Sequence, residues 1–427
     1  PFDEALVTHQ LDVVVLFLEQ QARAAERRRH LRFQAPFPSL RPGQETIQQN
    51  LDAAFAAPDS PIGALAPAQS RIVLLEAPTG YGKTGCALEF ALTQLQRGRF
   101  DRLLWLTGKS TGQLQVVETL RRMTAPEKCN LIGYTSPDAS SGTARAAQRE
   151  SHLLGDKSFG SPLPFWQVRN KGEHCVNVEF HCVRDSCRYL AGAAERWPQS
   201  GLARFHLDER QPRDLETLRA AGREALICPY EITRTALAFN DVWIGDYNYV
   251  FAPDNRGLFF DQPGFDPART LLVIDEAHNL PARVADAHSH RATDADARAL
   301  LAELDHLRAP AALLLAVENW ARLLGGLTPA DELDPLREAD VRDALERLAD
   351  LVARTPLDFA ALGPQPCEVL WSFPKLHAFL EDGQLHRLLW CRRAGELEFT
   401  CVDAAAAIGA TLRSFGGALL MSATLTP

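Results

Sequence analysis

The amino-acid sequence predicts an α/β fold: a parallel sheet with helices on both faces, interrupted by a small cysteine-bearing domain and a mainly helical insertion. Short, continuously apolar runs at 71–76, 102–106 and 271–274 have the composition of buried parallel strands. Segments with helical spacing, at 85–97 and 111–122, alternate with these runs. This alternation is the order that produces a parallel sheet covered by helices.

The remaining segments extend this sheet and its surroundings. Helices are predicted at 1–30 and 44–55, a surface loop at 57–70, and further strands at 128–133 and 418–424. The run Arg27-Arg28-Arg29 is interpreted as a solvated helix end.

Two stretches break the alternation and define the domain organisation. The first is irregular and rich in cysteine, and the second has helical spacing with many Ala and Leu residues. Trp320, Trp371 and Trp390 of the second stretch are expected in its core. We predict an N-terminal helix or linker at 1–30, a main lobe composed of 31–134, 241–280 and 401–427, a cysteine-bearing domain at 135–240 and a helical insertion at 281–400.

Composition and charge exclude several classes of protein. Hydrophobic residues make up 46% and charged residues 23%, which excludes a wholly disordered chain. The apolar run near the start, 13–18, is too short to span a bilayer, so no membrane association is expected. A net charge of −9 argues against a protein that coats nucleic acid by bulk charge, although a local basic groove stays compatible with it. The chain begins with Pro1 and has no leader pattern, and we expect an excised piece of a longer, cytoplasmic, bacterial-type intracellular protein.

A phosphate-binding loop follows the first predicted strand. The segment Ala77-Pro78-Thr79-Gly80-Tyr81-Gly82-Lys83-Thr84 lies between a strand and a helix, which is the context that a P-loop requires. The glycines allow backbone N–H groups to surround a phosphate at a helix N-terminus. Lys83 is expected to reach the β- and γ-phosphates of ATP, and the Thr84 hydroxyl is expected to bind Mg²⁺.

A pair of carboxylates follows the strand at 271–274. Asp275 and Glu276 are expected beside the P-loop, because the carboxyl ends of parallel strands meet at one edge of a sheet. Asp275 would hold the magnesium ion through water, and Glu276 would orient and deprotonate the attacking water. His278 completes the tetrad Asp-Glu-Ala-His and is predicted as a catalytic residue with these two and Lys83.

With both motifs in this order, the sequence resembles superfamily 2 helicases of the DEAH type, which implies a RecA-like lobe. Arg41-Pro-Gly-Gln44 is similar to the segment whose Gln contacts the adenine. The stretch containing Thr107, Lys109, Ser110 and Thr111 resembles the motif that contacts the single-strand backbone. Ser422-Ala423-Thr424 resembles the motif that couples hydrolysis to strand movement.

Four of the nine cysteines lie between these motifs. Cys175, Cys182, Cys187 and Cys228 have no Cys-x-x-Cys spacing, but four thiolates can bind a [4Fe–4S] cluster with loose spacing. Two alternatives stay open: a zinc site in which His174 or His181 substitutes for a thiolate, and unliganded thiols. The other five cysteines, at positions 86, 129, 367, 391 and 401, are interpreted as small buried hydrophobic residues.

The position of these cysteines, with Cys228-Pro-Tyr before the Asp-Glu-Ala-His strand, resembles the XPD/DinG-like iron–sulfur helicases. The resemblance covers about residues 37–427 and implies an Arch insertion after the tetrad, single-stranded or forked DNA as partner, and 5′ to 3′ movement. Aromatic and cationic residues near the cysteines could contact a DNA strand or could pack the small domain: Trp166, Arg169, Lys171, Arg184, Arg188 and Tyr189.

The resemblance also implies a second RecA-like lobe that supplies an arginine finger. Because the sequence ends three residues after Thr424, we expect that lobe to be missing and this chain to hydrolyse ATP poorly alone. The competing hypothesis is a metal-stapled module for nucleic-acid binding and partner docking, whose ATP site is vestigial or regulatory. A third hypothesis, that 1–30 is the tail of an upstream nuclease domain, has no nuclease motif to support it.

Overall fold

The computed structural model describes residues 4–56, 71–124, 163–207 and 211–424. The predicted loop at 57–70, the predicted strand at 128–133 and Cys129 therefore lie outside the described residues. Within the described part of the chain, no helix is both long and apolar enough to cross a membrane.

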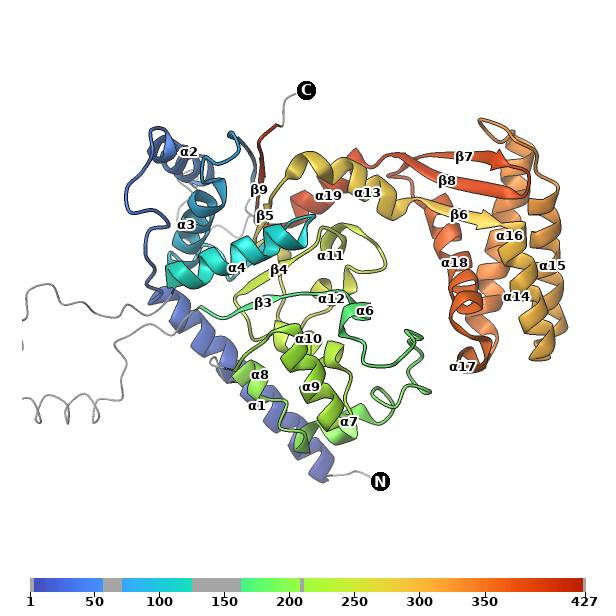
Figure 1. The fold of residues 1–427 in the computed structure, drawn as a ribbon, viewed down its shortest axis with the longest axis horizontal. Helices are drawn as coiled ribbons and strands as arrows, with labels where there is room; N and C mark the ends of the chain where they lie inside the picture. Colours follow the sequence, from blue (N-terminus) through green and yellow to red (C-terminus); the bar gives the residue numbers. More distant parts are fainter. Residues whose placement is uncertain (1–3, 57–70, 125–162, 208–210, 425–427) are drawn as a thin grey trace, which may run out of the picture.

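The main lobe is built on a six-stranded sheet in which every neighbouring pair is parallel (Figure 1). This confirms the predicted α/β fold class with its parallel sheet. In spatial order the strands are β1 (Arg71–Glu76), β9 (Gly417–Ser422), β5 (Thr270–Ile274), β2 (Arg102–Leu106), β4 (Val242–Gly245) and β3 (Phe165–Gln167).

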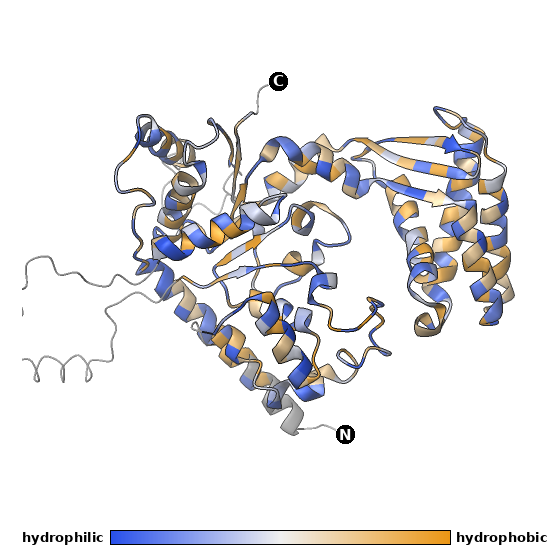
Figure 2. Ribbon diagram, in the orientation of Figure 1, coloured by the Kyte–Doolittle hydropathy of each residue, from blue (hydrophilic) through white to orange (hydrophobic). Residues whose placement is uncertain are grey.

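Helices cover both faces of this sheet because alternate strand residues point to opposite sides. Leu103, Val273 and Leu419 pack on one core, together with helices α2 (Gln44–Phe55), α3 (Lys83–Gln96) and α4 (Ser110–Thr124). Leu104 and Leu272 face the second core. That core contains residues of α10 (Pro229–Leu237), α11 (Asn248–Phe251), α12 (Gly257–Phe260), α13 (Leu280–His288) and α19 (Ala405–Ser414). Figure 2 shows apolar residues along the central strands and mixed polar and apolar residues on the helices.

The strand at 71–76 is not fully buried, which corrects the prediction. In the described part of the chain, β1 pairs only with β9 and forms one edge of the sheet. Ile72 and Leu74 are 41% and 65% exposed, whereas every residue of β5 is buried. An apolar run alone does not distinguish an edge strand from a central one.

The N-terminal helix α1 (Glu4–Arg29) ends on the main lobe and not in solvent. Arg28 is 8% exposed, and its Nη1 lies 2.6 Å from Oδ1 of Asp241, which is also buried. Arg27 Nη2 lies 2.7 Å from Oδ2 of the same carboxylate. The interpretation of this arginine run as a solvated helix end was therefore wrong for two of its three residues. The aspartate that binds them is more than 200 positions away in the sequence.

The cysteine-bearing segment is a set of short helices around β3, which joins the main sheet. They are α6 (Lys171–His174), α7 (Ala193–Arg196), the 3₁₀ turn η1 (Trp197–Gln199), α8 (Arg204–Leu207) and α9 (Leu215–Ala225), before α10. Two further 3₁₀ turns, η2 (Pro267–Arg269) and η3 (Ala277–Asn279), flank β5.

The helical insertion extends from the main lobe after α13 and returns through α19 (Figure 1). Its helices are α14 (Asp294–His306), α15 (Ala311–Gly325), α16 (Pro335–Arg354), α17 (Phe359–Leu362) and α18 (Pro364–Glu381). It also contains a three-stranded antiparallel sheet of β6 (His290–Thr293), β8 (Glu396–Asp403) and β7 (His386–Arg393).

The tryptophans of this insertion differ in burial. Trp320 is 1% exposed and lies in the core, as predicted. Trp371 is 39% exposed, so its predicted core position is wrong, and Trp390 is half-buried with its indole N–H donated to Thr400. The cysteines at 86, 367, 391 and 401 are buried, which confirms their interpretation as small core residues.

Candidate functional site

The P-loop connects β1 to α3 with two glycines in the left-handed region. Gly80 and Gly82 have φ of 75° and 89°, a conformation that residues with a Cβ rarely adopt. A Cβ on Gly82 would also lie 2.6 Å from the Phe37 ring, so this position excludes any larger residue. The loop therefore delivers Lys83 and Thr84 as the first two residues of α3, at its N-terminus.

Backbone carbonyls hold the Lys83 side chain inside the loop. Lys83 is 8% exposed, and its Nζ donates to the carbonyls of Ala77 at 2.7 Å and Pro78 at 3.2 Å. The ammonium group is thus fixed at the centre of the turn that the glycines create.

The segment before α2 braces the loop from outside. Gln44 is fully buried and donates its side-chain N–H to the Tyr81 carbonyl at 2.7 Å, while its Oε1 accepts from Arg41 N–H at 2.9 Å. Arg41 donates to the Gly80 carbonyl at 2.6 Å, and the Tyr81 hydroxyl donates to the Pro42 carbonyl. In this structure, Arg41 and Gln44, the two residues before α2 that were predicted to contact ATP, bind the backbone of the loop.

One cavity brings the P-loop and the acidic strand end together. Its volume is about 280 Å³, and Lys83, Thr84, Asp275 and Glu276 all contribute to its wall. The register of the sheet explains this, because β1 and β5 both pair with β9 in the same direction. The cavity is also lined by Phe37, Thr79, Gly80, Gly82, Gly85, Gln115, Thr119 and Arg122.

The two carboxylates of this cavity differ in environment. Asp275 is 9% exposed, and burial raises the pKa of its carboxyl group; the charge of Glu276 also raises it, while Lys83 lowers it. Glu276 has φ 54°, a backbone conformation that is strained for a residue with a side chain. Its side chain is 41% exposed. A nearby cation therefore stabilises the buried carboxylate of Asp275 the most, and the carboxylate of Glu276 is accessible to water.

His278 joins the acidic segment to the last strand. Its Nδ1 lies 2.7 Å from the Ser422 hydroxyl and 3.4 Å from a carboxylate oxygen of Glu276. The same hydroxyl accepts from the Thr424 N–H at 3.2 Å. Ala423, between them, is half-buried. The segment predicted to couple hydrolysis to movement is thus in direct contact with the acidic tetrad.

Tyr247 was not predicted as a functional residue, although the sequence Asp246-Tyr-Asn-Tyr249 attracts notice before the acidic strand. Its buried hydroxyl donates to the carbonyls of Asp275 and Glu276, the latter at 3.1 Å. Its ring packs on Gly108. Burial raises the pKa of this hydroxyl far above its usual range, so it stays a donor. Tyr247 therefore connects the acidic segment to the stretch after β2.

The predicted strand-contacting residues follow β2. Thr107 is buried, whereas Lys109, Ser110 and Thr111 are exposed at the start of α4. Ser110 lines a cavity of about 400 Å³, which we call the Ser110 cavity, with Arg169 among its other residues. Phe37, Arg122 and Tyr247 are among the site residues that no local motif indicated.

The four clustered cysteines line one small cavity in the cysteine-bearing segment. Cys187 Sγ accepts from the Asn177 side chain at 3.4 Å, and Cys228 N–H donates to the Tyr189 carbonyl at 2.9 Å. Burial raises the pKa of the Cys228 thiol, which disfavours a free thiolate there. Among the described residues, no group of three or more His, Cys, Asp or Glu side chains has the geometry to hold a metal ion.

The two histidines near these cysteines are engaged elsewhere. His174 is 1% exposed, and its ring nitrogens lie 2.9 Å from the Asn170 carbonyl and 3.0 Å from the Thr233 hydroxyl. His181 Nε2 lies 3.0 Å from the Phe359 carbonyl, in the helical insertion. Both ring nitrogens of His174 therefore have partners other than a metal ion.

Comparisons with known proteins place these features in context. Residues 166–296 match the DEAD_2 family model. The regulator of telomere elongation helicase 1 homolog of Arabidopsis thaliana is 25% identical over 331 residues, which cover 71% of this chain and 29% of that protein. The Fanconi anemia group J protein homolog of Gallus gallus is 27% identical over 138 residues, 32% of this chain and 11% of that protein. The chain thus spans less than a third of the length of these relatives.

Two solved structures share the fold. One, titled XPD_Helicase, has a TM-score of 0.53 and 15% identity, and the match covers 92% of this chain and 59% of that one. Another, titled Truncated XPD, has a TM-score of 0.51 and 15% identity, and the match covers 90% of this chain and 93% of that one. Together with the order of the motifs, these similarities confirm that the chain resembles the XPD/DinG-like superfamily 2 helicases.

Proposed function

We propose that this chain carries one RecA-like motor lobe of an ATP-dependent DNA helicase that moves 5′ to 3′ on single-stranded or forked DNA. The observation that carries the proposal is the single cavity that Lys83, Thr84, Asp275 and Glu276 line together. The names of two similar proteins, the regulator of telomere elongation helicase 1 homolog and the structure titled XPD_Helicase, support the helicase activity. The DNA substrate and the 5′ to 3′ direction are extended from the resemblance of the motifs.

The chemistry follows from the environment of each side chain. Lys83 and the N-terminus of α3 stabilise the negative charge of the phosphates. Thr84 and Asp275 would hold Mg²⁺, which neutralises charge on the phosphate oxygens when it is bound. Glu276, exposed beside a buried carboxylate, orients a water molecule and accepts its proton.

Two contacts support a path from hydrolysis to the DNA strand. His278 binds Ser422, so a change at Glu276 reaches the last strand of the sheet. Tyr247 binds the backbone of Asp275 and Glu276 and packs on Gly108, next to Lys109. A displacement of the acidic segment therefore alters both the coupling motif and the strand-contacting residues.

Two neighbouring cavities, which share three lining residues, support a strand-binding surface. The Ser110 cavity is lined by Arg169 and Arg283, and a neighbouring cavity of about 370 Å³, the Arg234 cavity, by Lys171, Arg184 and Arg234. Asn170, Tyr249 and Asn255 line both. Arg283 and Arg234, both exposed, pair with the half-buried carboxylates of Asp246 and Glu231 at 3.1 and 3.4 Å. Phosphate groups can replace these carboxylates.

We further propose that the four cysteines hold a [4Fe–4S] cluster. All four cysteines line the same small cavity, which supports a shared set of ligands, as such a cluster requires. A single zinc ion needs its ligands to converge within about 2.3 Å of one point, and His174 has no free nitrogen to join them. Zinc is the alternative metal.

Iron analysis tests this assignment. After anaerobic purification, the chain is expected to be coloured and to contain about four iron and four sulfide ions per molecule, as the cluster type requires. A Cys182→Ser variant is expected to lose both, while Cys401→Ser, at a buried cysteine outside the cavity, is expected to keep them. Colourless protein with stoichiometric zinc would contradict the assignment.

We propose that a second RecA-like lobe of the full-length protein supplies an arginine finger to the cavity lined by Lys83 and Glu276. The match to nearly all of a truncated relative, but to 59% of a longer one, supports this division. The 427-residue chain alone is expected to hydrolyse ATP about a thousandfold more slowly than a protein that also contains the second lobe. Measured DNA-stimulated turnover that is equal in the two proteins would contradict the proposed role of the second lobe.

A further inference from the structure

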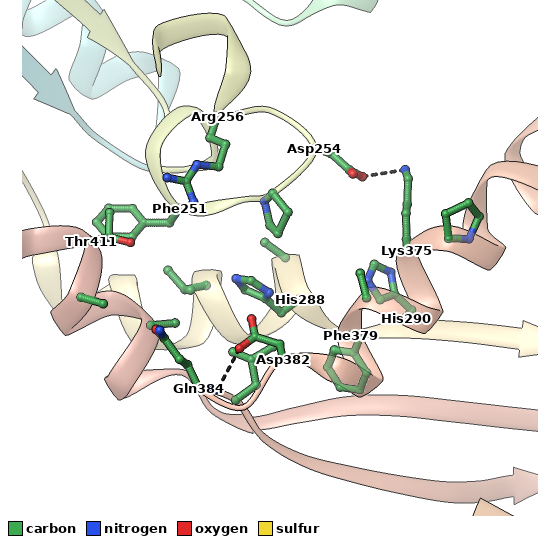
Figure 3. A pocket seen from close by; sticks show the side chains of 18 of the residues that line it. Phe251, Asp254, Arg256, His288, His290, Lys375, Phe379, Asp382, Gln384 and Thr411 are labelled. Atoms are coloured by element: carbon green, nitrogen blue, oxygen red, sulfur yellow. Dashed lines mark hydrogen bonds and ion pairs between the residues drawn. The ribbon is translucent and has the colours of Figure 1, made fainter. Parts of the chain in front are cut away.

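A large cavity lies where the helical insertion meets the main lobe, and we call it the junction cavity (Figure 3). Its volume is about 680 Å³, within the range of sites that enclose a ligand, and such sites are common between domains. The main lobe contributes Phe251, Arg256, His288 and Thr411, and the insertion contributes His290, Lys375, Phe379 and Gln384.

A short loop separates the junction cavity from the proposed strand-binding surface. The loop at 253–256 connects α11 to α12, and its residues are exposed. Asn255 lines the Ser110 and Arg234 cavities, Arg256 lines the junction cavity, and Asp254 lines both the Arg234 cavity and the junction cavity. The three cavities therefore follow one another, with Asp254 at the last boundary.

One ion pair spans this boundary. Lys375 Nζ lies 2.6 Å from Oδ2 of Asp254, and the two side chains are 44% and 52% exposed (Figure 3). An ion pair with this much exposure contributes little to stability and can exchange partners. Lys375 follows Pro374, which removes one backbone hydrogen bond inside α18. The helix is therefore weakened next to the residue that pairs with Asp254 of the main lobe.

We propose that the junction cavity is a second binding station for single-stranded DNA, closed by the Asp254–Lys375 ion pair until a phosphate group replaces the carboxylate. This inference rests on the proposed function, because it extends the proposed strand path. Lys375 exchanges one anionic oxygen for another, and Arg256, which lies over the Phe260 ring at 4.6 Å, provides a second cation on the same wall. The apolar wall, with Phe251 and Phe379, suits a base.

Binding of short and long oligonucleotides to the 427-residue chain tests the inference. An oligonucleotide of about 6 nucleotides covers the first two cavities only, and one of about 20 nucleotides can also reach the third. Lys375→Met is expected to weaken binding of the long oligonucleotide about fivefold near 0.1 M salt. It is also expected to reduce the slope of log affinity against log salt concentration by about 0.7, the value for one phosphate contact. Neither change is expected for the short oligonucleotide.

A second variant is expected to change the affinity for the long oligonucleotide in the opposite direction. Asp254→Asn removes the competing carboxylate, so it is expected to tighten binding of the long oligonucleotide about twofold to fivefold, again without effect on the short one. Arg354→Met is the matched control, because Arg354 also forms an exposed ion pair in the insertion, with Asp350 at 2.6 Å, away from all three cavities. It is expected to leave both affinities unchanged.

The outcomes separate the inference from the function on which it rests. Equal effects of Lys375→Met on both lengths, or weaker long-strand binding by Asp254→Asn, would overturn the second station and leave the proposed function intact. An unmodified chain that binds neither oligonucleotide would overturn the strand-binding function itself.

Discussion

A Glu276→Gln substitution, made in a protein that contains this chain and a second lobe, is expected to reduce ATP hydrolysis about a thousandfold and abolish unwinding. Glutamine can still accept a hydrogen bond from water but cannot remove its proton, and general-base catalysis contributes about 10²–10⁴ in rate. ATP binding is expected to persist, because Lys83 and Thr84, which contact the phosphates in the proposed mechanism, are unchanged. Steady-state hydrolysis and nucleotide affinity measure the two effects.

Glu346→Gln is the matched control for this experiment, because Glu346 is exposed on α16, in the helical insertion. It removes the same charge and is expected to leave hydrolysis and unwinding unchanged. Unwinding that survives Glu276→Gln would exclude the motor function and favour the alternative, a nucleic-acid-binding module whose ATP site is regulatory.

An Asp275→Asn substitution is expected to eliminate magnesium-dependent hydrolysis while it raises the thermal stability of the chain. Burial and the charge of Glu276 raise the pKa of this carboxyl in the folded state above its unfolded value. Folding therefore destabilises the charged carboxylate of Asp275. Between the unfolded and the folded pKa of this group, the folded state binds more protons than the unfolded state. At neutral pH, removal of the charge is expected to raise the Tm by about 1–3 °C.

The pH dependence checks the sign of this effect. As the pH falls through the raised pKa of Asp275, its carboxyl group becomes protonated and the unmodified chain becomes more stable. The difference in Tm between Asp275→Asn and the unmodified chain is therefore expected to shrink on acidification. Asp340→Asn, at an exposed position on α16, is the control and is expected to change neither property. A lower Tm for Asp275→Asn at neutral pH would contradict the assigned environment.

The parts of the site that the sequence predicted are those set by local chain geometry. The P-loop and the acidic tetrad each follow a strand, and parallel strands end at the same edge of a sheet, so the shared cavity could be expected from the order of the motifs. The strands β2 and β5 were recognisable because both of their faces are buried, which favours apolar residues at every position. The strand β4 is also fully buried but was not predicted.

The parts that the sequence did not predict depend on contacts between distant residues. Asp241 binds two arginines of α1 and Tyr247 binds the acidic segment, and neither has a local pattern that indicates its partner. Trp371 was expected in the core but is exposed. Helical spacing predicts a helix there, but it does not give the rotation of α18 against its neighbours. The four cysteines share a cavity, yet spacing alone does not give the geometry of their sulfurs.

The position of β9 constrains how the protein is made. This strand lies between β1 and β5, with Gly417 paired to both Arg71 and Leu271. During translation, β1 emerges from the ribosome long before β9, so its apolar edge stays unpaired until β9 has been synthesised. Pairing across so long a stretch of chain is slow, so synthesis of this protein favours cellular conditions in which chaperones shield nascent chains.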